Sequence, residues 1–178
     1  MGSITLDTNT KLHNCRVEVM MDAFLQDYSY MFPYSQELII AAGIHDIGKH
    51  YIPMEILNAP RKLTDEERKT IDWHAYYGYE LAKEQGYSDV ICKMVLYHHG
   101  ADKPKKSGLN VSDEIKRHAA LLQVIDAYDA LTSKRAYHEK ISDEKAMTIL
   151  EASSEYDSEA VALLAGWMNR KNVLARTM

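Results

Sequence analysis

The sequence predicts an all-α protein of about six or seven helices. Along most of the chain, apolar residues recur at intervals of three and four, which is the spacing of one helix face. No stretch of the sequence shows the alternation of period two that is typical of strands. A length of 178 residues suits one domain with a substantial core. We therefore expect a single compact helical domain over residues 1–178.

The first two helices are predicted from apolar spacing and capping residues. Residues 8–28 carry apolar side chains at helical intervals, and Asp7 or one of the threonines at positions 8 and 10 can cap them. A connector broken by Pro33 follows. Ser35 is then expected to cap a second helix, which runs into a His-Asp pair and is stopped at Gly48.

The middle of the chain is predicted as a loop followed by a helix. Residues 50–63 contain two prolines and should form a loop with one short helical turn at 54–57. Thr64 precedes a glutamate at capping-box spacing and starts a helix that carries His74. Gly78, four residues after His74, indicates either close approach of another backbone or a local weakness.

Four further helices complete the prediction. An apolar helix over 88–99 delivers paired histidines at its end and stops at Gly100. A lysine-rich loop over 101–110 separates it from a long helix over 113–134. Ser142 is expected to cap the first of the last two helices, and Ser158 starts the second.

Composition limits the classes of partner. The net charge of −5 leaves no broad basic surface for a nucleic-acid polymer, so an anionic substrate needs metal ions or a few placed cations. The two cysteines suit a reducing compartment and stand in no zinc-type spacing. No signal peptide is visible, and the longest apolar run is far shorter than the roughly 20 residues of a membrane span. We expect a cytoplasmic protein without a membrane partner.

Seven polar residues on or beside these apolar helices are of metal-binding type. Burying an imidazole or a carboxylate is costly unless something compensates it, and a metal ion does so for both. The His45-Asp46 pair alone fits a helix end that meets solvent equally well, and His13 alone fits a surface histidine. The complete set suits two transition-metal ions. Its members are His13, His45, Asp46, His74, His98, His99 and Asp126.

Two metal ions explain why the set contains five imidazoles and two carboxylates. Asp46 has two oxygens and can bridge the ions, with the other six residues divided between two sites. We assign His13, His45 and Asp126 to one site and the remaining three histidines to the other. Two ions at about 3.5–4 Å can hold a hydroxide between them and clamp an in-line displacement at phosphorus. The absence of a cysteine-rich set argues against a structural zinc site.

With these seven residues, the paired His98-His99 and the segment from Asp129 to Arg135, the sequence resembles the HD superfamily of metal-dependent phosphohydrolases, and within it the HD-GYP branch. The resemblance covers about residues 10–140. Its most specific parts are the paired His98-His99 and the segment Asp129-Ala-Leu-Thr-Ser-x-Arg135. The segment Glu55-Ile-Leu-Asn-x-Pro-x-Lys-Leu-Thr64 before His74 and the spacing His74-x-x-x-Gly78 fit the branch as well.

The resemblance implies a helical phosphodiesterase that opens bacterial cyclic dinucleotides, chiefly cyclic di-GMP, at an iron or manganese centre. It implies the seven residues above as ligands, with Asp46 bridging. Lys49 would face the scissile phosphate and stabilise its charge, and Arg135 would contact a phosphate or support its loop. Asp129 is expected beside the ligands and not among them. The three remaining histidines, His50, His118 and His138, match no ligand position.

Two departures from the branch bear on substrate and metal count. After His98-His99 the branch has a Gly-Tyr-Pro segment that shapes the substrate pocket, and residues 100–109 of this chain lack it. Phosphate-ester hydrolysis is therefore better supported than cyclic di-GMP as the particular substrate. Members with a third metal carry a carboxylate at the position of Asn9, and asparagine is a weak ligand. We accordingly predict two metals.

Three further functions stay open on the sequence alone: hydrolysis of another nucleotide, a di-iron oxygenase, and a non-catalytic nucleotide-binding module. The segment from Asp126 to Tyr137 argues against the oxygenase. The complete ligand set argues against the binding module. The sequence gives no oligomeric state and does not choose between iron and manganese.

Overall fold

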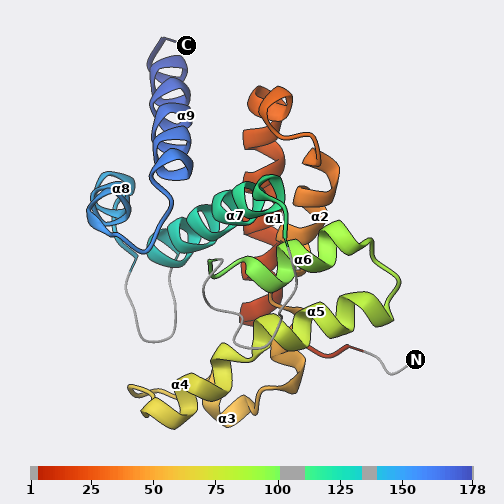
Figure 1. The fold of residues 1–178 in the computed structure, drawn as a ribbon. Coiled ribbons are helices and arrows are strands. Elements are labelled where there is room, and N and C mark those ends of the chain that lie inside the picture. Colours follow the sequence, from red (N-terminus) through yellow and green to blue (C-terminus); the bar gives the residue numbers. More distant parts are fainter. Residues whose placement is uncertain (1–3, 101–110, 134–139, 178) are drawn as a thin grey trace.

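The structure is a computed structural model that describes residues 4–100, 111–133 and 140–177. Every regular element within these ranges is helical, which confirms the all-α class (Figure 1). In chain order the elements are α1 (Thr8–Tyr28), η1 (Ser29–Met31), α2 (Ser35–Ile44), η2 (Ile47–Tyr51), α3 (Met54–Leu57), α4 (Asp65–Asp72), α5 (His74–Glu84), α6 (Asp89–Tyr97), α7 (Asp113–Thr132), α8 (Asp143–Ala152) and α9 (Ser158–Thr177), where η marks a 3₁₀ helix.

The described helices outnumber the six or seven predicted, for two local reasons. The expected turn after Pro53 is a separate helix, α3, of four residues. The helix that starts after Thr64 is divided at Trp73 into α4 and α5. This division makes His74 the first residue of α5, so its side chain is carried by the start of a helix.

Most of the predicted caps form. The carboxylate of Asp7 accepts from the backbone N–H groups at the start of α1. Thr64 and Glu67 complete the reciprocal capping box of α4. Serine hydroxyls accept from the backbone at the starts of three further helices, α6, α7 and α8. These caps satisfy backbone donors that have no partner within their own helix.

Two boundary predictions around α2 are wrong. Ser35 is the first residue inside α2 and not its cap, because its hydroxyl donates to the carbonyl of Phe32 in the preceding turn. Gly48 does not stop the helix, because α2 already ends at Ile44 and Gly48 lies inside η2. The His-Asp pair thus sits in the turn between an α-helix and a 3₁₀ helix.

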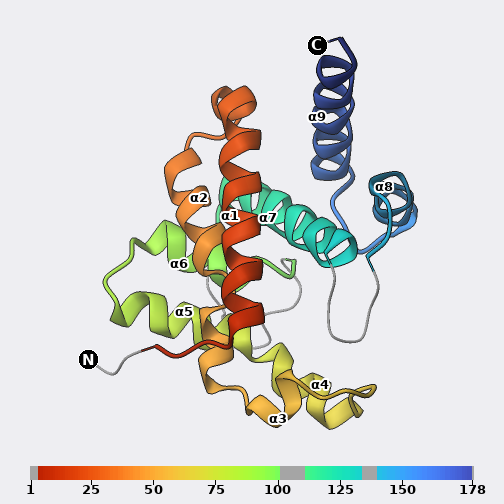
Figure 2. The same cartoon turned by 180° about the vertical axis from the view of Figure 1, so that it is seen from behind.

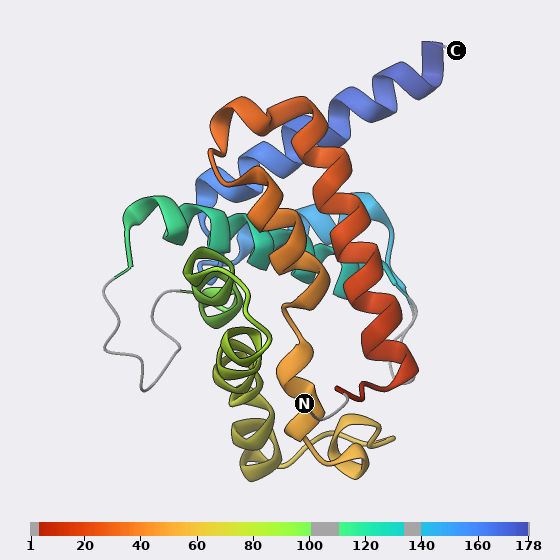
Figure 3. The ribbon, with the colours of Figure 1, turned by 90° about the vertical axis from the view of Figure 1, so that its right-hand side faces the viewer.

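The core lies where α1, α2, α6 and α7 pack together, and α5 packs against both α6 and η2 (Figures 1 and 3). α8 and α9 pack on α7 (Figure 2). α9 also contacts the end of α1, where Trp167 meets Phe24 and donates its indole N–H to Asp27. Among the described residues, no helix combines the length and the apolar character needed to cross a bilayer. The fully buried side chains of the core include Val17, Met21, Phe24, Leu38, Met94, Leu121, Leu122 and Ile125.

Candidate metal centre

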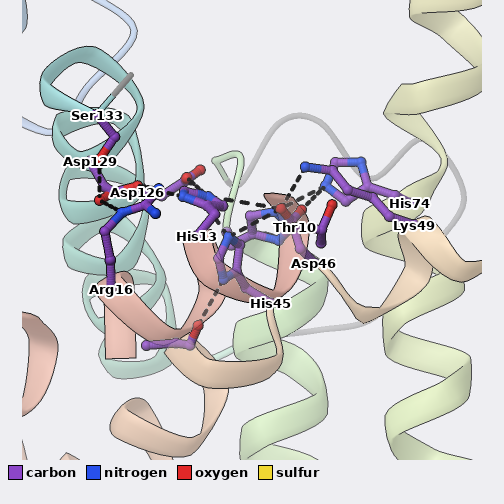
Figure 4. A network of polar contacts seen from close by, with 12 residues as sticks. Thr10, His13, Arg16, His45, Asp46, Lys49, His74, Asp126, Asp129 and Ser133 are labelled. Atoms are coloured by element: carbon purple, nitrogen blue, oxygen red, sulfur yellow. Dashed lines mark hydrogen bonds and ion pairs between the residues drawn. The ribbon is translucent and has the colours of Figure 1, made fainter. Parts of the chain in front are cut away.

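The seven candidate ligands come from five separate segments and meet at one place. α1 carries His13, and α7 carries Asp126. The other five residues lie at helix ends: His45-Asp46 after α2, His74 at the start of α5, and His98-His99 after α6. Figure 4 shows α1, the α2–η2 turn, the start of α5 and α7 directing their side chains toward one another. Within the described part of the chain, two groups have the geometry to hold a metal ion.

The first group, here called the histidine triad, is His74, His98 and His99. Nε2 of His74 lies 3.2 Å from Nε2 of His98 and 3.0 Å from Nε2 of His99. The Nδ1 atoms of His74 and His98 each donate to the backbone carbonyl three residues earlier, at 2.6 Å. These donations fix the proton of each neutral ring on Nδ1 and leave a lone pair on Nε2.

The facing nitrogens of the histidine triad call for a cation. The lone pairs of His74 and His98, which meet at 3.2 Å, repel each other and are compensated when a metal ion accepts both. Burial, reinforced by the neighbouring imidazoles, holds the pKa of His98 well below its usual range. Burial also lowers the pKa of His99 to about 4, with His74 contributing. His98 and His99 are thus unprotonated at neutral pH, as metal binding requires.

The second group, here called the mixed triad, is His13, His45 and Asp46. His45 donates from Nδ1 to the carbonyl of Ala42 at 2.8 Å. Its Nε2 is fully buried and has no hydrogen-bond partner among the described residues. An orphaned acceptor of this kind is rare in a protein interior. It is explained if Nε2 binds a metal ion.

Asp126 adds a second carboxylate to the mixed triad, which already contains that of Asp46. Oδ1 of Asp126 lies 2.8 Å from Nε2 of His13 and 3.7 Å from Nε2 of His45. The two oxygens of Asp46 face different groups. Oδ2 lies 3.6 Å from Nε2 of His45, in the mixed triad, and Oδ1 lies 3.2 Å from Nε2 of His74, in the histidine triad. This carboxylate therefore links the two groups.

A hydrogen-bonded network supports His13, and the sequence predicted its central residue, Asp129, but not the contacts that Asp129 makes. Asp129 accepts from Nδ1 of His13 at 2.6 Å and is held from the other side by Arg16, whose guanidinium donates at 2.7 and 2.8 Å. The hydroxyl of Ser133 also donates to Asp129, at 2.9 Å. A carboxylate that accepts from a ligand's second ring nitrogen fixes the orientation of that ring. The only sequence signal for Arg16 was its position one turn after His13.

The protonation of His13 follows from these two carboxylates. Although burial opposes its charged form, hydrogen bonds to Asp126 and Asp129 raise the pKa of His13 to about 9. Burial likewise opposes charge on the two carboxyls, but the hydrogen bonds from His13 hold the pKa of each below its usual range. Without metal, the mixed triad is thus compensated by an internal ion pair.

Lys49 is a partly exposed cation beside Asp46. Its ammonium group forms an ion pair with Oδ2 of Asp46, and its side chain is 20% exposed. Despite burial, the positive charge of Lys49 and the nearby His45 hold the pKa of Asp46 well below its usual range. A groove of about 630 Å³ opens beside His99, lined by residues that include Gln123, Lys116 and Glu155.

Several other sequence predictions concern residues near the centre. Arg135 and His138 lie outside the described residues, as do the lysines of the 101–110 loop. His50 is paired with the backbone of Thr5, and His118 packs on Phe32 and bonds the carbonyl of Glu114. Neither belongs to the two triads, in line with their expected lack of a ligand role. Asn9 is exposed in the first turn of α1.

A close approach of two backbones sets the spacing between His45-Asp46 and His74. A Cβ on Gly48 would lie 1.9 Å from the carbonyl oxygen of His74 and 2.4 Å from the amide nitrogen of Gly78. η2 and α5 therefore touch through main-chain atoms at this point. This confirms the close approach that Gly78 indicated in the sequence and rules out a merely local weakness.

The HD domain family matches residues 10–160 of this sequence. The chain belongs to the HD domain family. All seven candidate ligands fall inside the matched residues. As an HD-domain protein with two clusters of histidine and carboxylate, the chain has side chains suited to binding divalent metal ions.

Curated relatives of this HD-domain chain include several named phosphodiesterases. A cyclic di-GMP phosphodiesterase of Pseudomonas aeruginosa is 33% identical over 75% of this chain. A cyclic di-GMP phosphodiesterase response regulator of Xanthomonas campestris is 35% identical over 71%. A 3'3'-cGAMP-specific phosphodiesterase of Vibrio cholerae is 29% identical over 88%. The chain spans about one third of the length of these relatives, between 33% and 35%.

Solved structures share the fold at lower sequence identity. An HDG"Y"P protein from Bdellovibrio bacteriovorus has a TM-score of 0.67 and 18% identity, covering 89% of this chain and 52% of that one. The HD domain of a phosphodiesterase from L. monocytogenes, in complex with cyclic-di-AMP, has a TM-score of 0.60 and 19% identity, covering 86% and 85%. At these identities the likeness supports the helical HD-type fold.

Proposed function

We propose that this chain is a metal-dependent phosphodiesterase that hydrolyses a cyclic dinucleotide at two divalent metal ions. The observation that carries the proposal is the meeting of imidazole nitrogens and carboxylate oxygens in two adjacent triads that Asp46 links. The relatives add the substrate class, because the three described above are named for cyclic di-GMP or 3'3'-cGAMP. We place the chain near the HD-GYP branch on the same grounds.

The donor set supports two ions of the iron or manganese type. Imidazole nitrogen with carboxylate oxygen suits such ions, and the described residues place no cysteine in either triad. We assign the histidine triad to one ion and His13, His45 and Asp126 to the other, with Asp46 reaching both. When bound, two such ions supply a hydroxide near neutral pH and stabilise charge at the phosphate. An exposed Asn9 offers no carboxylate for a third.

The chain's own residues orient these donors. Backbone carbonyls hold three imidazoles, of His45, His74 and His98, with Nε2 directed inward. Asp129 does the same for His13. We propose that Lys49, which is partly exposed beside Asp46, binds a phosphate oxygen and stabilises charge that develops there. Arg135 remains a candidate for contacting the substrate.

The substrate is proposed as a class because the segment that shapes the pocket in the HD-GYP branch differs here. Residues 100–109 lack Gly-Tyr-Pro, and a lysine-rich sequence stands in its place. Cyclic di-GMP, 3'3'-cGAMP and cyclic di-AMP are therefore the first compounds to compare. Whether a linear product is cut a second time is decided by the same comparison.

The test is turnover of cyclic and linear dinucleotides by protein loaded anaerobically with ferrous iron or manganese. Asp46→Ala serves as the matched control, since its carboxylate links both triads. We expect linearisation of at least one cyclic dinucleotide, and its loss in the variant. Two bound metals per chain with no hydrolysis of any compound would refute the proposal. Oxygen-dependent turnover would then favour the oxygenase, and tight nucleotide binding alone would favour a binding module.

A further inference from the structure

A row of aromatic side chains lies along η2 and the start of α5, the segments that carry Lys49 and His74. The ring centroids of Trp73 and Tyr77 lie 6.2 Å apart, and those of Tyr77 and Tyr51 lie 5.5 Å apart. Tyr76 adds a fourth ring, 5.8 Å from Trp73. Three of these residues are half-buried, and Tyr51 is 54% exposed. The row is therefore part of the surface.

The row is attached directly to residues of the centre. Trp73 immediately precedes His74, and Tyr77 lies one turn after His74 on α5. Tyr51 follows Lys49 by two residues at the end of η2. A phosphate held by Lys49 and by a metal ion on the histidine triad would thus have these rings as neighbours.

The other recess beside the centre has a different chemistry. The groove next to His99 is lined by four carboxylates and two cations. Both cations are already paired, Lys116 with Asp113 and Arg117 with Glu159. The surplus of acid repels phosphate groups, and the aromatic residue that lines the groove, Tyr97, is buried. The aromatic row, in contrast, offers flat faces and carries no negative charge of its own.

We propose that three rings of this aromatic row, those of Trp73, Tyr77 and Tyr51, form a stacking platform for a nucleobase of the substrate. The inference rests on the proposed function and specifies how the same site recognises its substrate. Aromatic side chains bind any base through its π-face, and such stacking strengthens binding considerably for each base. The platform would hold the base while the adjoining phosphodiester lies at the metal ions. It would therefore contribute to substrate affinity and not to the chemical step.

Tryptophan fluorescence reports on the platform directly. The chain has two tryptophans. Trp167 is buried and donates its indole N–H to Asp27 at 3.0 Å, far along the chain from the centre. Titration with a hydrolysis-resistant phosphorothioate analogue of cyclic di-GMP should quench the emission saturably. The quenching should vanish in Trp73→Phe, while inorganic phosphate should leave the emission of the wild type unchanged. Quenching that persists in Trp73→Phe would overturn the proposal.

Kinetics provide the second readout. Trp73→Leu and Tyr77→Leu should each raise KM for the cyclic dinucleotide about tenfold, as loss of one base stack predicts, with kcat changed less than threefold. Trp73→Phe should restore KM, because a phenyl ring still stacks. The matched control is Tyr30→Leu, which removes an aromatic ring that is 80% exposed on η1. It should leave both constants unchanged.

Failure of the platform is distinguishable from failure of the proposed function. If the wild type hydrolyses a cyclic dinucleotide but Trp73→Leu keeps its KM, the platform is refuted and the phosphodiesterase stands. If the wild type hydrolyses nothing, the phosphodiesterase is refuted, and the fluorescence titration still decides whether Trp73 binds a base. An abasic dinucleotide diester adds a further check, since its KM should be the same in Trp73→Leu and the wild type.

Discussion

The two triads lie side by side, yet their charges are compensated in opposite ways. In the mixed triad, the imidazole of His13 is held between Asp126 and Asp129, and its pKa is raised to about 9. In the histidine triad, three imidazoles face one another, and among the described residues a single carboxylate, that of Asp46, reaches one of them at 3.2 Å. Without metal, the first group keeps an internal ion pair, and Nε2 of His45 is its one atom left without a hydrogen-bond partner among the described residues. The second is complete only when a cation joins it.

The difference indicates how metal and fold depend on each other. Removing metal from the mixed triad leaves an ion pair that still connects α1 to α7. Removing it from the histidine triad leaves facing lone pairs at the junction of α5 and α6. We expect metal to matter most for stability at that junction. Four predictions test this difference between the two triads.

The largest effect should come from deleting a ligand of the histidine triad. His98→Ala should lower turnover by more than about 100-fold, since losing a residue merely behind a ligand already costs about 10- to 100-fold. The variant should retain one metal per chain, because the mixed triad is intact. Metal analysis beside turnover checks this. Retention of two metals would contradict the assignment of His98.

Chelation should destabilise the protein by several kcal/mol. A ligand present at about 1,000 times its dissociation constant stabilises the folded state by about 4 kcal/mol. For a chain of this size, that corresponds to a fall in Tm of roughly 8–16 °C. Hydrogen exchange should show the loss of protection concentrated at the ends of α5 and α6. Equal loss along α1 and α7 would mean that the two triads do not differ as described.

The metal-free protein should lose stability at alkaline pH through His13. The pKa of His13 is raised to about 9 in the folded state, against about 6.5 in an unfolded chain. Its contribution is therefore fully present below pH 6.5 and is lost as the pH rises through 9. The loss amounts to at most about 3 kcal/mol. Denaturant unfolding of the chelated protein at several pH values measures it, and His13→Gln should flatten the dependence.

The smallest effects should come from the residues behind His13. Asp129→Asn should weaken binding of the metal at the mixed triad by about 10- to 100-fold, because the amide does not hold the His13 ring in the same way. Ser133→Ala removes one hydrogen bond to Asp129 and should cost about 1 kcal/mol of stability or less. Calorimetric metal titration measures the effect of Asp129→Asn, and denaturant unfolding measures the effect of Ser133→Ala. Expressed as free energies, the first should be the larger. A Ser133→Ala effect as large as that of Asp129→Asn would contradict this order.

Helix positions were largely predictable because apolar spacing and caps are local. The predicted helix over 8–28 coincides with α1, and the capping box at Thr64 forms as expected. The division at Trp73 was not predictable, because both flanking segments are compatible with a continuous helix. Its cause is tertiary: His74 has to face the centre at the point where α5 begins.

The candidate ligands were predictable from residue type, whereas their surroundings were not. Histidines and aspartates at the ends of apolar helices are recognisable in a sequence, because they interrupt an apolar segment. The contact between Arg16 and Asp129 joins residues 113 positions apart and has no local signature. The aromatic row is likewise made by packing η2 against α5, and nothing in the sequence near Tyr51 points to Tyr77.

The contact between Gly48 and the start of α5 also bears on engineering of the centre. Because main-chain atoms of the two segments touch, the distance between the His-Asp pair and His74 is set by the backbone and does not depend on rotamers. Exchanging one ligand for another should therefore alter which metal is preferred without altering the separation of the two sites. A residue larger than glycine at position 48 would have the opposite effect. It would keep every ligand but increase the separation of the two sites, because its Cβ would push η2 away from α5.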